Sequence, residues 1–88
     1  MFKFATAPVE GMEVTLTESV ELFSGQEIHA GMVGTVRYVF DDTVTVRFED
    51  IVSDVTGALY NDSASVAVDY LPETFAEFAD HEIVDDED

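Results

Sequence analysis

The sequence Val33-Gly34-Thr35-Val36-Arg37-Tyr38-Val39-Phe40 runs through Asp41-Asp42 into Thr43-Val44-Thr45-Val46-Arg47-Phe48. Apolar and polar residues alternate along much of this segment, and β-branched and aromatic residues dominate both halves. Such a pattern is typical of half-buried strands, and two consecutive aspartates favour a turn. The segment therefore predicts an antiparallel hairpin.

The register of this hairpin depends on which side chains share its buried face. Pairing Phe40 with Thr43 would set apolar residues opposite polar ones, and a one-residue slip turns every side chain to the other face. We therefore expect the next register, with a three-residue loop from Asp41 to Thr43. The expected pairs on the buried face are Phe40 with Val44, Tyr38 with Val46, and Val36 with Phe48.

The same register brings together two of the three basic residues of the chain. Arg37 and Arg47 then lie opposite each other on the outer face, where like charges repel. We expect a carboxylate to neutralise them. Glu13 on the first strand is the preferred candidate, and a carboxylate of a partner or of the chain's own tail is the alternative.

Two more segments, residues 12–17 and 65–70, alternate with the period of a strand. Residues 18–31 form a long loop that we expect to be packed, because it contains several apolar side chains. Residues 50–61 are less regular and partly apolar, with turn signals at Gly57 and Asn61-Asp62. The apolar faces of the two strands comprise Met12, Val14 and Leu16 in the first and Val66, Val68 and Tyr70 in the second.

The chain after Tyr70 predicts a short helix and then a tail. Leu71-Pro72 is a helix start, because proline is favoured at the first helical position. Phe75 and Phe78 fall on one side of that helix, where they either pack in the core or anchor a partner. From residue 80 to 88, six of nine residues are acidic, which is typical of a solvated tail.

These elements predict a mainly β fold: a small five-stranded barrel with a short C-terminal helical turn. Segments 11–17, 30–36, 44–48 and 66–71 resemble the SH3-like barrels of the KOW-related kind, and Gly31-Met32-Val33-Gly34-Thr35-Val36 is the most specific part. The resemblance covers residues 11–71. It implies an SH3-like barrel at 11–79, an N-terminal arm at 1–10 and an acidic tail at 80–88.

Many functions share that fold, and composition restricts the choice. The chain has 20 Asp and Glu against 3 Lys and Arg, a formal charge of −17. Direct binding to nucleic acid or to an anionic membrane is disfavoured, because both need clustered basic residues. The nucleic-acid-binding members of the family are basic, and peptide-binding SH3 domains use a Trp that this chain lacks. Basic partner surfaces are favoured, while solubility or adaptation to salt is the alternative reason for the charge.

Nucleic-acid mimicry is a stronger form of the same idea. Area scaling gives about 5,000 Å² of surface, so the net charge averages about one per 300 Å². Duplex DNA carries about one per 100 Å². Mimicry therefore requires the carboxylates to gather on one face.

Catalysis, metal binding and membrane insertion find little support. His29 and His81 are the only histidines, there is no Cys, and no nucleophile elbow is present. The acidic groups Asp41-Asp42, Glu49-Asp50 and 85–88 lack the spacing of a calcium loop. No apolar segment approaches the roughly 20 residues of a membrane span, and the N-terminus lacks the apolar core of a signal peptide.

We therefore expect a non-enzymatic, cofactor-free, cytoplasmic module that docks on a basic protein surface. A phage or mobile-element inhibitor of a nucleic-acid-binding host enzyme, such as RNA polymerase or a nuclease, fits this size and charge and would act in the host cytoplasm. The alternative is a structural subunit of a virion or a redox complex. The candidate partner-binding residues are Arg37, Arg47, Asp41, Asp42, Glu49, Asp50, Phe75 and Phe78.

Overall fold

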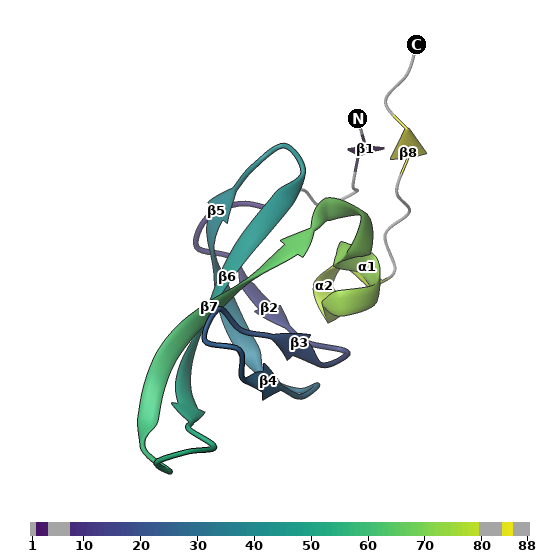
Figure 1. The fold of residues 1–88 in the computed structure, drawn as a ribbon. Coiled ribbons are helices and arrows are strands. Elements are labelled where there is room, and N and C mark those ends of the chain that lie inside the picture. Colours follow the sequence, from purple (N-terminus) through teal and green to yellow (C-terminus); the bar gives the residue numbers. More distant parts are fainter. Residues whose placement is uncertain (1, 4–7, 80–83, 86–88) are drawn as a thin grey trace.

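The computed structural model describes residues 2–3, 8–79 and 84–85 and is built mainly of antiparallel strands (Figure 1). This confirms the expected β class. The strands are β1 (Phe2–Lys3), β2 (Glu13–Thr15), β3 (Val20–Glu21), β4 (Glu27–Ile28), β5 (Val33–Val39), β6 (Thr43–Val52), β7 (Leu59–Ala67) and β8 (Val84–Asp85). The helices are the 3-10 turn η1 (Val68–Tyr70), α1 (Leu71–Thr74) and α2 (Ala76–Ala79). Among the described residues, none of these helices has the length and apolar character needed to cross a membrane.

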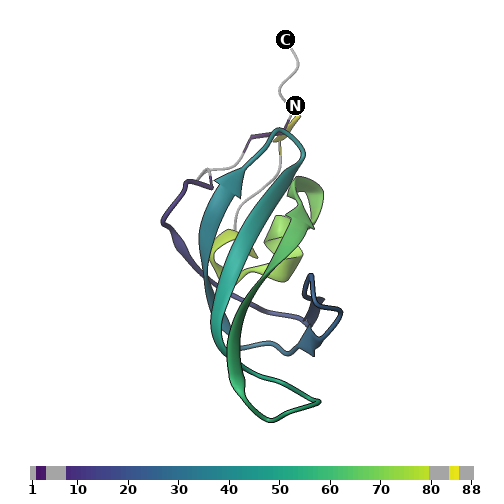
Figure 2. The same cartoon turned by 60° about the vertical axis from the view of Figure 1, so that its left-hand side comes forward.

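A curved sheet with the strand order β2-β5-β6-β7 forms the body of the molecule. The helices and the two-stranded ribbon β3–β4 lie on one side of it (Figures 1 and 2). The core fills the space between the sheet and this cover. Its fully buried side chains are Val14, Leu16, Val36, Val44, Val46, Phe48, Leu71, Thr74, Phe75 and Phe78, with Leu22 and Ile28 added from the ribbon side.

The register of the β5–β6 hairpin differs from the one expected. The Phe40 N–H donates to the Thr43 carbonyl at 2.8 Å, which closes a two-residue loop at Asp41-Asp42. Further along, the register shifts between Val36 and Tyr38. Arg37 is therefore the extra residue of a β-bulge, which re-phases the strand so that Val36 stays buried.

The bulge moves two predicted core residues to the surface. Tyr38 pairs with Thr45 and not with Val46, and Phe40 lies at the loop. Their side chains are 54% and 56% exposed, and their ring centroids lie 6.3 Å apart. The shift also separates the two arginines, because Thr35 lies opposite Arg47.

The β6–β7 hairpin is longer than the sequence pattern indicated. β6 continues to Val52 and β7 begins at Leu59, so Asn61-Asp62 lies inside a strand and not in a turn. The real turn is at 53–58, where Gly57 has a φ of 74°. β7 ends at Ala67, so Val68 and Tyr70 belong to η1 and do not continue the strand.

The helix after Tyr70 begins as expected, with Pro72 in its first turn. It is interrupted at Phe75, whose extended backbone (φ −124°, ψ 135°) bridges to Leu16 of the first strand segment. The two short helices close that edge of the sheet. The Thr15 N–H donates to the Glu77 carboxylate at 2.7 Å, and the Thr17 N–H donates to the Thr74 carbonyl at 2.7 Å.

The first and last described segments pair with each other, Phe2 with Asp85 and Lys3 with Val84. This pairing joins residues 84–85 of the expected acidic tail to the N-terminal arm. The rest of the segment at 80–88 lies outside the described residues.

Candidate functional site

The acidic residues of the described chain are spread over the whole body. All 14 acidic side chains within residues 8–78 are exposed or half-buried. Every strand and helix of residues 8–79 except β5 contains at least one acidic residue. The remaining acidic residues lie in the connecting loops. The surface is therefore generally anionic.

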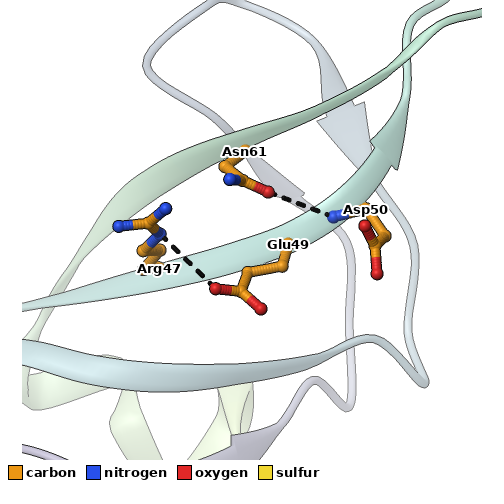
Figure 3. A network of polar contacts seen from close by, with 4 residues as sticks. All are labelled: Arg47, Glu49, Asp50 and Asn61. Carbon is orange, nitrogen blue, oxygen red and sulfur yellow. Dashed lines mark hydrogen bonds and ion pairs between the residues drawn. The ribbon is translucent and has the colours of Figure 1, made fainter.

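Arg47 lies near the middle of β6 and contacts Glu49 of the same strand (Figure 3). Its Nε lies 3.9 Å from Glu49 Oε1, an ion-pair distance too long for a hydrogen bond. This Nε is shut off from solvent, and it has no hydrogen-bond partner among the described residues. The carboxylate close to Arg47 thus comes from Glu49 and not from Glu13 as expected.

Asp50 occupies a second irregularity of β6, between Phe48 and Ile51, with a φ of 57°. Its N–H donates to the Asn61 side-chain oxygen on β7 at 3.4 Å (Figure 3). Few residues other than glycine tolerate positive φ, although Asp and Asn do so more readily than most. The bulge re-aims this part of β6 and presents the Asp50 carboxylate to solvent.

The two acidic candidates of the β5–β6 loop lie far from this position. Asp41 and Asp42 form the exposed loop at the opposite end of β6. Asp50 lies eight positions after Asp42 along the strand, roughly 25 Å at the rise of a strand. The sequence candidates therefore do not form one cluster, and Arg37 stands exposed on the bulge between the two ends.

The two phenylalanine candidates are not surface residues. Phe75 and Phe78 are both 0% exposed and belong to the central core cluster. A partner cannot reach them without unfolding the helices. Their assignment as partner-binding residues is wrong, and the alternative of core packing holds.

The structure adds a groove that sequence patterns did not indicate. It has a volume of about 650 Å³ and lies between the β4 region and the end of β6. Its floor is apolar, and its rim carries three carboxylates and one imidazole. We call it the acidic groove; its lining includes Glu27, Ile28, His29, Met32, Asp50, Ile51, Val52 and Asp54.

Gln26 lines the acidic groove and ties the β3–β4 ribbon to the β6–β7 loop. Its side-chain amide donates to the Val52 carbonyl at 2.7 Å, and its oxygen accepts from the Asp54 N–H at 3.2 Å. The same oxygen accepts from the Tyr60 hydroxyl at 3.0 Å. Beyond Phe48, β6 has no strand partner on its β5 side among the described residues. There the Gln26 side chain bonds the Val52 carbonyl, as the backbone of a neighbouring strand would.

Asp62 makes a second link between the ribbon and β7. Its carboxylate accepts from the Ser24 N–H at 3.0 Å and from the Ser63 N–H at 2.8 Å. Partial burial acts to raise the pKa of Asp62, but the hydrogen bonds from Ser24 and Ser63 outweigh it and hold the pKa below the usual 3.8.

His29 lies on the rim of the groove and makes one contact of chemical interest. Its Nδ1 lies 3.3 Å from the Ser19 hydroxyl, and both side chains are exposed. Within the described part of the chain no carboxylate hydrogen-bonds this imidazole, and no three potential ligands converge to hold a metal ion. His81 and the acidic group at 85–88 fall outside the side chains described.

The acidic groove can therefore hold a cationic side chain at its rim and an apolar group on its floor. Both features suit a protein surface rich in Lys and Arg. No protein-family model matches this chain, and no curated protein or solved structure is significantly similar to it.

Proposed function

We propose that this protein is a non-enzymatic binding module that docks on a basic surface of a partner protein. The observation that carries the proposal is the uncompensated charge of the described residues. All 14 described carboxylates reach the surface, and within this part of the chain a single ion pair, Arg47–Glu49, offsets them. Such a surface accelerates encounter with cationic partners and repels nucleic acid and anionic membranes.

The acidic groove is the contact surface that we assign to this docking. Val52 is 57% exposed on its edge, and Asp50 and Asp54 stand beside it. Apolar contacts that lose water hold a complex together, whereas rim charges mainly set the rate of association and the choice of partner. The groove offers both within one concave surface.

The fold proposed for the module is the SH3-like barrel. In support, the hairpins β5–β6 and β6–β7 follow one another in a single sheet, and β2 lies beside β5. A 3-10 turn then returns the chain so that Phe75 bridges Leu16 and closes the sheet against the helices. Because this fold hosts many functions, it does not itself select one.

Mimicry of nucleic acid is the stronger form of the proposal, with RNA polymerase or a nuclease of a host cell as target and a phage or mobile element as source. Seventeen net charges over 5525 Å² give about one per 325 Å², against about one per 100 Å² for duplex DNA. The even spread of the carboxylates favours docking on a basic protein over imitation of a duplex. In either form we place the module in the cytoplasm.

A structural subunit of a larger assembly is the second candidate. It is favoured by exposed apolar side chains, among them Val55 (92%), Phe23 (65%) and Leu59 (63%) near the β6–β7 loop. Such a subunit should self-associate when isolated. A monomer at low salt in sedimentation, with no change as concentration rises, excludes this candidate.

The docking proposal is tested by capture from a lysate on the immobilised protein, with elution by rising salt. We expect basic proteins to be retained at low salt and released as salt increases. A groove variant, Glu27→Gln with Asp50→Asn and Asp54→Asn, should retain less of the same proteins. Its matched control is Glu10→Gln with Glu13→Gln and Asp69→Asn, which removes equal charge outside the groove lining.

Purified partners from this capture are then titrated against both variants. Loss of affinity in the groove variant, and little loss in the control, supports the groove as the contact surface. If no protein is retained at low salt, or if retention is insensitive to salt, the docking proposal is wrong.

A further inference from the structure

Strands β3 and β7 begin to pair and then separate. The Phe23 N–H, just beyond β3, donates to the Ser63 carbonyl of β7 at 2.9 Å. Toward Val20 and Ala67 the two strands lie in different sheets, with a pocket of about 370 Å³ between them. We call this space the β3–β7 slot; its lining comprises Glu18, Val20, Glu21, Ser65, Val66, Ala67, Tyr70 and Thr74.

Unpaired backbone groups face this slot from both sides. In an antiparallel strand, the N–H and C=O of alternate residues point to the same neighbour. Ser63 faces β3, so Ser65 and Ala67 also point away from β6 and into the slot. Leu22 donates to Gln26 on the β4 side, so the backbone of Glu21 points to β7.

The two edges of the main sheet therefore differ. The β2 edge is sealed by the Glu77 carboxylate and by the Thr74 carbonyl. At the β7 edge, no described residue pairs with the outward backbone groups of Ser65 and Ala67. Natural sheets usually cover or disrupt such an edge, because it can pair with another chain.

The size of the slot suits a short strand. One strand residue occupies about 160 Å³, from a rise of 3.3 Å, a strand spacing of 4.8 Å and a sheet spacing of 10 Å. The slot therefore accommodates two to three extended residues, and the segment from Ser65 to Ala67, whose two outward positions are unpaired, matches that length.

We propose that the β3–β7 slot binds a short extended peptide segment that carries Lys or Arg at alternate positions, by strand addition to β7. The segment bonds the backbone of Ser65 and Ala67 on one side and of Glu21 on the other. Its apolar residues turn inward to Val20 and Val66, which line the inner part of the slot.

Charge selects this occupant. Glu18 and Glu21 are both exposed at the mouth of the slot, and no basic residue lines it. A second copy of this chain, with a formal charge of −17, would meet repulsion there. The exposed ring of Tyr70 (59%) adds a face on which a cation can rest.

This inference rests on the proposed function for the sign of the partner's charge, and its test is separate. The probe is an acetylated and amidated heptapeptide with Lys and Val in alternation, titrated at low salt and followed by NMR. We expect fast amide exchange at Ser65, Ala67 and Glu21 in the free protein and protection of these amides when the peptide binds. The same peptide with Glu in place of Lys should not bind.

Two variants test the charges and the backbone in turn. Glu18→Gln with Glu21→Gln should weaken binding about fivefold, the effect of two rim ion pairs. The matched control Glu10→Gln with Glu13→Gln, which lies outside both the slot and the acidic groove, should not weaken it. Ser65→Pro removes one outward N–H without touching the β6 ladder and should abolish protection at Ala67.

Three results would overturn the proposal that the β3–β7 slot binds a peptide. They are protection of the Ser65 and Ala67 amides without peptide, peptide binding that leaves them unprotected, and equal loss in both charge variants. The last two leave docking on basic partners intact. Failure of lysate capture at low salt removes the docking proposal itself.

Discussion

Replacing Gly34 with Ala should destabilise the protein strongly, because the observed register puts Phe48 directly opposite this glycine. A Cβ at Gly34 would lie 2.6 Å from Val46 Cγ1 and 2.7 Å from Phe48 Cε1. Optimal carbon contacts are about 3.5–4.0 Å, so the neighbours must move by about 1 Å. Both neighbours are 0% exposed, so other core side chains surround them and must move as well.

Overpacking of this kind costs about 1–3 kcal/mol. At about 4–8 °C per kcal/mol for a domain of this size, the melting temperature should fall by roughly 5–20 °C. The assay is thermal and chemical unfolding followed by far-ultraviolet circular dichroism. In the register expected from the sequence, Gly34 would face Asp50, and the substitution would be nearly neutral.

A double-mutant cycle identifies the cause of the loss. Phe48→Leu opens space beside Gly34, so the double variant should lose about 1 kcal/mol less than the sum of the single variants. Gly31→Ala is the matched control. It suffers from its φ of 98° but would meet no atom within 4 Å, so it should show no coupling to Phe48→Leu. Additivity of Gly34→Ala with Phe48→Leu, or a neutral Gly34→Ala, would refute the observed register.

Three further results are expected. The free energy of unfolding should rise with salt, because salt screens the repulsion among the carboxylates. The Debye length falls from roughly 30 Å at 0.01 M to 3 Å at 1 M. An unchanged melting temperature would mean that the charges are already compensated. Because the pKa of Asp62 is lowered in the folded state, its carboxylate stabilises the fold above pH 3.8, and this stabilisation is lost as the pH falls through the folded-state pKa. Wild type should therefore lose more stability than Asp62→Asn over that acid range. Equal losses would contradict the hydrogen bonds assigned to Asp62. Gln26→Ala should cost about 1 kcal/mol of stability and speed amide exchange at Asp54, measured by NMR. Gln26→Glu should behave similarly, because a carboxylate cannot donate to the Val52 carbonyl. An unchanged exchange rate at Asp54 would show that the Gln26 hydrogen bonds do not hold the loop.

The β class and the position of the β5–β6 hairpin were predictable, because alternation around residues 33–48 is a local property of the chain. The register was not. A two-residue loop combined with a bulge at Arg37 buries Val36, and so would a three-residue loop without a bulge. The local sequence pattern does not distinguish these two arrangements. The exposure of Tyr38 and Phe40 follows from that single extra residue.

The site was less predictable than the fold. Phe75 and Phe78 have the same spacing whether they pack inward or bind a partner, and only the position of the helices against β2 decides between these outcomes. The acidic groove and the β3–β7 slot join residues far apart in sequence. Gln26 gives no sequence signal, because its role depends on the distant Val52 carbonyl.

The central claim is that an uncompensated anionic surface docks on a cationic protein. Its most direct measurement is the salt dependence of the dissociation constant between this chain and a captured partner, for wild type and for the groove variant. We predict affinity that falls steadily as salt rises, with a shallower dependence in the variant. An affinity that is flat across salt, with the same value in both proteins, would contradict the claim.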